Sequence, residues 1–392
     1  MREAADGVHL PVTENNEHLG LIVSGVGEEI KNVDKNIRSA RSTLFSLLGN
    51  VFSYRCMISP SVLSHVWSIY VSPVLRSGLS TLPIRPPAMK TITAFHNKIL
   101  RGILKLSSVS PLPPLYFLLG ELPIEAALHQ DIFALFWNIW DNQHTKVHTI
   151  VKYLLMMSDD SSLTWSVHLR LLFKMYNLPD PLTLLSSQAM PKQRWKMLTK
   201  TAVTAFHELK WRLKAKANSK LRFFNVQTLG LSGRPHPVLS GIVTTRDVQR
   251  SRVHIKMLSG DYPSFYNLSH GSYQQSYCRL CHSLCPHQQP PEEDIVHILT
   301  LCKGTRNERS HHISNLLNVV SSHFPDNEIL SHTSHRHLTQ FILDPTSLNL
   351  PMTIRIPPSH PALENLLDIS RNMCFAIHKA RTRQIKNNHT IV

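Results

Sequence analysis

The sequence predicts a mainly α-helical protein. Apolar residues recur at intervals of three and four in successive segments, and prolines punctuate the gaps between those segments. Hydrophobic residues make up 42% of the 392 positions, which is enough to bury a sizeable core, and the length allows two or three domains. We therefore expect a helical bundle, then a basic connector, a small metal-binding knuckle and a C-terminal amphipathic helix.

The N-terminal part divides into a short extended run and a series of helices. Residues 1–24 end in an apolar run broken by Gly20, which predicts a strand or hairpin arm. From Glu28 the apolar spacing predicts one amphipathic helix that stops at Gly49. We expect residues 25–180 to be helical throughout, with further helices at about 61–75, 89–106, 124–141, 147–157 and 163–176.

A change in composition near Pro191 marks the basic connector, residues 181–270. Between residues 192 and 256 there are fifteen Lys and Arg but only two acidic residues, an excess of thirteen out of a formal net charge of +16. Such a charge predicts polyanions, nucleic acid above all, as partners, because binding releases condensed counterions. A solvated helix face is the plainer alternative, although ordinary exposed faces mix both signs. The aromatic residues Trp195, Trp211, Phe223 and Phe224 lie among these charges and could stack on bases, with core packing as the alternative.

Residues 271–310 carry a cysteine cluster with metal-ligand spacing. Cys278 and Cys281 form a CxxC knuckle, and one helical turn places His297 and Cys302 on a common side. The resulting pattern, C-x2-C-x15-H-x4-C, predicts a closed site that binds structural Zn²⁺ and leaves no position for a catalytic water. Cys285, His282 or His287 could replace one ligand. The alternative is that Cys302 and Cys285 are small core residues and His297 lies on a helix face.

The remaining segment, residues 311–392, contains a second amphipathic helix. Apolar residues between 362 and 386 form a broad face, and lysines and arginines crowd the last turns, where they complement the helix dipole. We expect this helix to dock on the body of the protein.

The sequence indicates no catalytic residues. It lacks the glycine-rich phosphate loops GxxxxGK[ST] and GxGxxG and the HExxH metal motif. Asp159 and Asp160 resemble a polymerase aspartate pair only superficially, because the aromatic residue two positions before the first aspartate is missing. We therefore expect no enzymatic activity from this chain alone.

Nothing in the sequence predicts export or membrane insertion. The apolar runs are shorter than the roughly 20 residues needed to span a bilayer, and the N-terminal residues lack a secretory signal. We expect an intracellular protein of the cytoplasm, the nucleus or both, with reduced cysteines and no membrane partner.

Several blocks, in order, are similar to the C-terminal part of non-LTR retrotransposon reverse transcriptases. His18-Leu19-Gly20 resembles the strand turn after the family's palm, and residues 37–49 resemble its first thumb helix. Residues 67–78 match the pattern W-x-x-Y-V-x-P-x-L-x-x-G. Residues 95–101 and 118–123 continue the resemblance, and the cysteine segment resembles the family's CCHC knuckle.

The resemblance implies that residues 1–24 are a remnant of the palm or the turn after it, and that residues 25–180 form a thumb that grips nucleic acid. The chain departs from the family here: the palm, with its paired catalytic aspartates, should precede Glu17, and only sixteen residues do, so we expect the chain to lack the polymerase centre. RNA or DNA would be bound without sequence preference, through the backbone. The expected contacts are Lys98, Arg101, Lys192, Arg194, Lys196, Lys200, Lys210, Arg212, Lys214, Lys216, Lys220 and Arg222.

Two other functions remain open at this stage. One is a domesticated zinc-containing module that recruits a protein, in which the charge is incidental. The other is an active reverse transcriptase or endonuclease, which would need a convergent carboxylate cluster that the sequence does not display.

Overall fold

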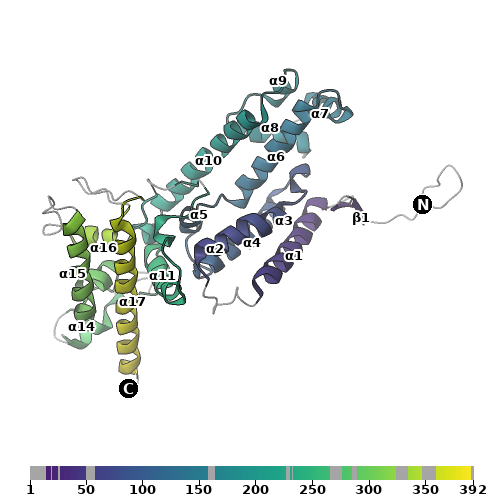
Figure 1. Ribbon diagram of the computed structural model, residues 1–392. Coiled ribbons are helices and arrows are strands. Elements are labelled where there is room, and N and C mark those ends of the chain that lie inside the picture. The colour runs from purple at the N-terminus through teal and green to yellow at the C-terminus, as the bar shows by residue number, and fades with distance from the viewer. Residues whose placement is uncertain are drawn as a thin grey trace. The chain divides into compact units, whose positions relative to one another are not determined.

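The computed structural model describes residues 15–18, 20–24, 27–49, 58–157, 164–226, 230–231, 233–264, 276–284, 289–323, 334–346 and 359–389 (Figure 1). These residues are predominantly helical, as predicted. Cys285, His287, Asp159 and Asp160 lie outside them, so the predictions for those residues are not addressed. Within the described part, no helix combines the length and the apolar character required to span a membrane.

The contacts divide the chain into two compact units, each built from separate segments. Unit 1 comprises residues 1–50, 65–99 and 122–209, and unit 2 comprises residues 51–64, 100–121 and 210–392. Three of the five crossings between the units fall within helices, namely α2 (Pro60–Val66), α4 (Pro86–Leu104) and α10 (Lys192–Lys216). The other two follow residues 50 and 121. The division of the chain into the segments 1–24, 25–180, 181–270, 271–310 and 311–392, which the sequence suggests, stays a prediction.

Unit 1 begins with a hairpin and a long helix. Strands β1 (Asn15–His18) and β2 (Leu21–Ser24) pair antiparallel across a turn in which Gly20 has a φ of +81°. Helix α1 (Glu28–Leu48) ends at Gly49, as its sequence predicts. It packs on the π-helical turn η2 (Trp67–Val71) and on α3 (Ser72–Arg76), and η3 (Leu79–Thr81) follows. Asn36 of α1 fixes this packing by donating to the carbonyls of Leu75 and Ser77, at 3.2 and 2.7 Å.

The second part of unit 1 is held by an aromatic core. It contains α6 (Ile124–Asp141), α7 (Lys146–Met157), α8 (Trp165–Met175), α9 (Pro181–Leu185) and the first part of α10. Phe133, Phe136, Trp140, Phe173 and Trp195 are buried together, with several edge-to-face ring contacts. Rings of this size contribute much of the apolar area that stabilises a core.

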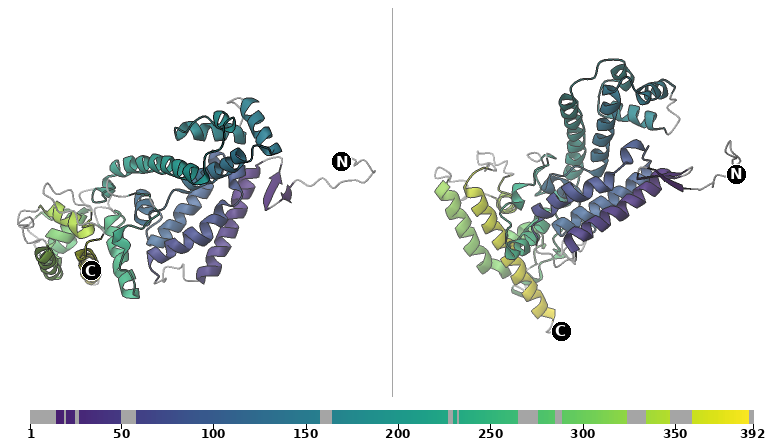
Figure 2. Two further views of the ribbon diagram at one scale, coloured as in Figure 1. Left: turned by 45° about the horizontal axis from the view of Figure 1, so that its top comes forward. Right: turned by 45° about the vertical axis from the view of Figure 1, so that its right-hand side comes forward.

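Unit 2 contains α5 (Pro113–Leu119) and the C-terminal helices. After η4 (Ser219–Leu221) and η5 (Pro237–Leu239) come α11 (Thr245–Leu258), α14 (Arg279–Leu284), η6 (His297–Leu301), η7 (Lys303–Thr305), α15 (Arg306–His323), α16 (His335–Leu343) and α17 (Ala362–His389). Helix α17 packs against α11 and lies beside α15 (Figure 2). The C-terminal helix is therefore docked, as expected.

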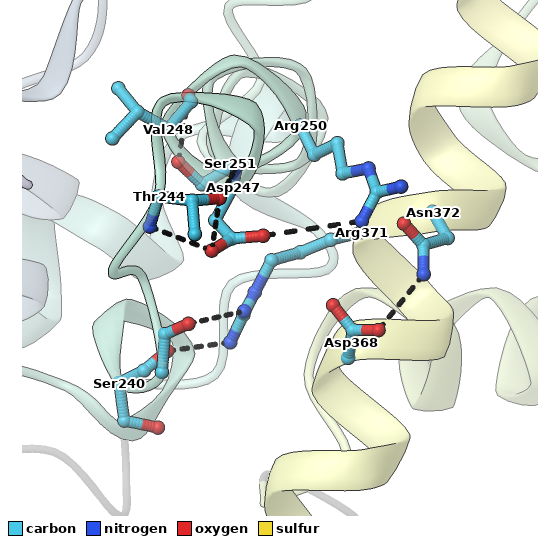
Figure 3. Close-up of polar contacts among 10 residues, drawn as sticks. Ser240, Thr244, Asp247, Val248, Arg250, Ser251, Asp368, Arg371 and Asn372 are labelled. Carbon is cyan, nitrogen blue, oxygen red and sulfur yellow. Dashed lines mark hydrogen bonds and ion pairs between the residues drawn. The ribbon is translucent and has the colours of Figure 1, made fainter. Parts of the chain in front are cut away.

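A buried arginine joins α17 to the segment before α11. The Arg371 side chain donates to the carbonyls of Ser240 and Gly241, at 2.6 and 3.5 Å (Figure 3). Arg371 is 2% exposed, and burial is the main cause that lowers the pKa of its guanidinium. Two backbone carbonyls thus accept hydrogen bonds from the Nη atoms of a buried cation, and these bonds fix the position of α17.

The basic connector contains a 25-residue helix, α10, for which the sequence suggested no more than a charged face. Every fourth residue of α10 is buried, from Trp195 through Val203 and His207 to Ala215. Trp195, Trp211, Phe223 and Phe224 are all less than 8% exposed. These four rings therefore pack in the interior and do not lie at the surface, where they could stack on bases.

Candidate metal centre and basic surface

Cys278, Cys281, His297 and Cys302 converge in unit 2. Their ligand atoms all lie within 4.8 Å of one another, and all four residues are buried. The two pairs of sulfur atoms at Cys278–Cys302 and Cys281–Cys302 are 3.7 and 3.9 Å apart, and Cys281 Sγ lies 3.4 Å from His297 Nε2. The four residues that the spacing selects are brought together as predicted.

These distances fit the edges of a metal-centred tetrahedron. With metal–sulfur and metal–nitrogen bonds of about 2.3 and 2.0 Å, neighbouring sulfurs lie about 3.8 Å apart, and sulfur and nitrogen about 3.5 Å apart. The three distances given above agree with these values to within about 0.1 Å. Three thiols and one imidazole around one point therefore make a site compatible with a metal ion.

The local backbone explains how the ligands converge. The bridge between Tyr277 and Glu292 closes the loop behind the CxxC turn, and Cys278 N–H donates to Pro291 O at 2.8 Å. Helix α14 then begins directly after Cys278 and carries Cys281. In the π-helical turn η6, Cys302 N–H donates to His297 O at 2.7 Å, which places the last two ligands on one side.

Backbone amides also support negative charge on the sulfurs. The amides of Cys281, Lys303 and Gly304 donate to the sulfurs of Cys278, Cys281 and Cys302 respectively. The hydrogen bond with Cys278 and the proximity of His297 lower the pKa of Cys302, whereas that same bond and burial raise the pKa of Cys278. One thiolate is therefore favoured by the protein alone, and a bound cation would favour ionisation of the other thiols.

Two contacts attach this centre to α17. The Arg381 guanidinium donates to the Glu293 carboxylate at 3.1 and 2.5 Å, and both side chains are less than 10% exposed. Gln384 Nε2 donates to Gly304 O at 3.1 Å, next to the last ligand. Metal binding by the four ligands would thus also fix the position of the C-terminal helix α17.

Most of the cations predicted to bind nucleic acid lie at the surface. Lys98, Lys192, Arg194, Lys196, Lys200, Lys214, Lys216, Lys220 and Arg222 are exposed, and Lys210 and Arg212 are half-buried. Three of the exposed cations also have partners: Lys192 lies over the ring of Trp137, Lys214 over that of Trp211, and Arg222 pairs with Asp294 at 2.5 Å.

Arg101 differs from the others because it makes internal contacts. Its Nε and Nη2 donate to the hydroxyl and the carbonyl of Ser110, at 3.2 and 3.1 Å. Burial also lowers the pKa of its guanidinium. The structure thus gives Arg101 a role in holding the turn that contains Ser110.

Arg336 is a surface cation that the sequence reasoning missed. It lies in the first turn of α16 and lines a cavity of unit 2 with Arg212, Lys216 and Arg222. The segment around Arg336 carries no charge run or motif, and it is far from α10 in the sequence. No sequence signal could therefore have grouped these residues.

Comparisons with protein-family models, curated proteins and solved structures give no match for this chain.

Proposed function

We propose that this chain binds nucleic acid through phosphate contacts, as the C-terminal portion of a non-LTR retrotransposon reverse transcriptase. The observation that carries the proposal is the charge of residues 192–256, which contain fifteen Lys and Arg residues and only two acidic residues. Lys192, Arg194, Lys196 and Lys200 are all exposed on α10, where a phosphate backbone could reach them. The contacts would be independent of base sequence, and the proposal assigns no catalytic step to these residues.

The position of the cations in α10 supports an anionic ligand. Lys192 and Arg194 occupy the first turn of the helix, which has no acidic residue. Cations are unfavourable there because the helix dipole places partial positive charge at this end. A bound phosphate would offset both the side-chain charges and the dipole, which is the usual arrangement for anions at helix N-termini.

We assign zinc to the four-residue centre, with a structural role. Three thiolates and one imidazole at tetrahedral distances are the donors that zinc prefers, and four protein ligands leave no open position for a substrate. The metal would stabilise the fold of the segment from Cys278 to Cys302.

The blocks that resemble the reverse transcriptase family contact one another within unit 1. The rings of Trp67 and His96 stack with centroids 5.3 Å apart, and His96 Nδ1 accepts from Ile124 N–H at 3.2 Å. Burial lowers the pKa of His96 to about 3, so this imidazole is neutral and can accept that bond. Trp67 and His96, which belong to two of these blocks, therefore pack against each other, and His96 also fixes Ile124, the residue directly after the block 118–123. This shared packing supports treating the blocks as one pattern.

Charge reversal on α10 tests the proposal. The triple variant K192E/K196E/K200E should bind a long RNA or duplex DNA at least about tenfold more weakly than the wild type in filter binding, because three phosphate contacts are replaced by repulsion. The control K90E/K146E/K174E changes the net charge equally at three exposed lysines outside the proposed set.

The control separates local contacts from net charge. The control variant should retain affinity to within about threefold, because charges distant from the ligand are largely screened. Equal losses in the two variants would contradict specific contacts by α10 and leave only a general effect of charge.

A second candidate function, recruitment of a protein, is favoured by an exposed apolar stripe on α7. Val147, Ile150, Leu154 and Met157 follow helical spacing and are each at least 45% exposed. Such stripes occur at helix–helix interfaces. This function predicts that substituting the stripe by serines abolishes partner binding while nucleic-acid affinity persists; pull-down and filter binding on one preparation decide between the two.

A further inference from the structure

A cavity in unit 2 has the chemistry of an anion site. It has a volume of about 610 Å³ and lies between the end of α10, the segment 218–226 and the first turn of α16. Arg212, Lys216, Arg222 and Arg336 line it, and among the described lining residues there is no Asp or Glu. The volume is within the range of cavities that hold small ligands.

Of these cations, Arg222 is partly neutralised by a neighbour. Its guanidinium pairs with Asp294 at 2.5 Å and lies over the Phe223 ring, 5.0 Å from the ring centroid. This pairing holds Arg222 against the wall of the cavity. Lys216 of α10 and Arg336 of α16 both line the cavity and are exposed, so they are the residues best placed to meet a phosphate.

The start of α16 adds to the positive potential. Ser334 caps the helix by accepting the His337 N–H at 3.3 Å, and Arg336 lies in a first turn without acidic residues. A cation at this end opposes the helix dipole and costs stability in the absence of an anion. The combination is therefore better suited to binding an anion than to stabilising the helix.

The cavity also has an apolar part. Leu213 lines it and is 60% exposed, although the neighbouring residues on α10 are charged. Gln340 of α16 also lines the cavity and joins α16 to the segment 218–226 by donating to Phe223 O at 2.8 Å. An apolar side chain open to solvent beside cations suits a ligand that has a flat apolar part next to its charge.

We propose that this cavity binds one unpaired nucleotide of a single-stranded nucleic acid, with its phosphodiester at Lys216 and Arg336 and its base against Leu213. A single nucleotide fits the volume, whereas a duplex can present only its backbone to such a cavity. The inference rests on the proposed function and deepens it, because it assigns single strands to one site on a broader basic surface.

Fluorescence anisotropy with a labelled oligothymidylate of about four nucleotides tests this site, since the probe is long enough for one such cavity. The variant K216E/R336E should bind the probe at least about tenfold more weakly, and the control K90E/K146E should differ from the wild type by less than about threefold. L213S, which keeps the charge, should weaken binding about threefold by removing the apolar contact. Circular dichroism and thermal melting check that each variant is folded.

Competition identifies what the cavity recognises. Unlabelled oligothymidylate should displace the probe at a concentration at least about tenfold lower than pyrophosphate does, because the apolar contact of the base with Leu213 and the further phosphates of the strand add to the contacts that pyrophosphate can make. Equal displacement by pyrophosphate, or unchanged affinity in K216E/R336E, would overturn the nucleotide site.

The failure of this inference can be told apart from the failure of the proposed function. If K216E/R336E binds the short probe as tightly as the wild type does, while K192E/K196E/K200E binds long RNA more weakly, this inference fails and the proposed function stands. If the wild type binds the short probe at the cavity but no long strand, the proposed function fails instead.

Discussion

The four metal-ligating side chains are the clearest case of a site that residue spacing alone specifies. Cys278 and Cys281 are separated by one turn, and His297 and Cys302 by another, so the backbone brings each pair together locally. Only the meeting of the two pairs is a tertiary event. Arg336 cannot be assigned from spacing in this way, because it is far from Arg212 and Lys216 in the sequence and lines one cavity with them only in the folded structure.

Removing one ligand tests the metal centre. Cys281→Ala should reduce bound zinc from about one per chain to near zero, because three remaining donors hold the ion poorly. The melting temperature of the protein should fall by about 5–10 °C, as expected when a few kcal/mol are lost in a protein of this size. Metal analysis and thermal melting measure the two effects.

Cys374 provides the matched control. It is a buried thiol outside the cluster, and burial raises its pKa to about 12, so it stays protonated. Cys374→Ala should retain full metal content. His297→Cys, which restores a thiolate donor, should retain zinc where His297→Ala does not; zinc loss in the Cys374 variant alone would contradict the assignment.

At the scale of elements, most helices follow from apolar spacing and stop signals. The predicted segment 124–141 coincides with α6, and α1 stops at Gly49 as expected. Helix α10 is harder to recognise because only every fourth residue is buried and the intervening positions mix lysines with exposed Met197, Leu198 and Leu209. Its buried stripe is too narrow to stand out as an apolar face in the sequence.

The start of α11 makes a prediction about pH. Thr244 and Asp247 form a capping box, in which Thr244 N–H and Oγ1 donate to the carboxylate at 2.8 and 2.7 Å (Figure 3). The Thr244 hydroxyl is the main cause that lowers the pKa of Asp247. Thr244→Ala should therefore cost about 1 kcal/mol of unfolding free energy at neutral pH.

The sign of the pH effect follows from the direction of the shift. A carboxyl with a lower pKa in the folded state contributes stability above its unfolded pKa, and this contribution is lost as the pH falls through the folded value. The difference between wild type and Thr244→Ala should shrink below about pH 4. Urea unfolding across this range measures it, with exposed Thr245→Ala as control; a difference that grows on acidification would refute the cap.

Gly120 is required at the end of α5 for two reasons. Its φ is +65°, and a Cβ atom there would lie 2.2 Å from the carbonyl oxygen of Arg234. Gly233 has a φ of +78°, but no atom lies within 4 Å of a Cβ placed there. Substitution of Gly233 therefore measures the cost of the backbone conformation alone, without a steric clash. Gly120→Ala should cost more than about 3 kcal/mol and Gly233→Ala about 1 kcal/mol in urea unfolding. Equal costs would show that the close approach to Arg234 is absent.

At the scale of the whole molecule, composition predicts more about the partner than about the architecture. The excess of cations between residues 192 and 256 is evident from the sequence, and the structure exposes most of those that were named. The two units cannot be predicted in the same way. Each is assembled from segments separated along the chain, and three of the five crossings fall within helices, where composition does not change.

The central claim is that phosphate contacts provide the binding energy, and the salt dependence of the affinity for duplex DNA tests it most directly. Filter binding should give a logarithmic slope against salt concentration of about −4 or steeper, and the slope should weaken by about 2 to 3 in K192E/K196E/K200E. An affinity that hardly changes between low and physiological salt would contradict the claim.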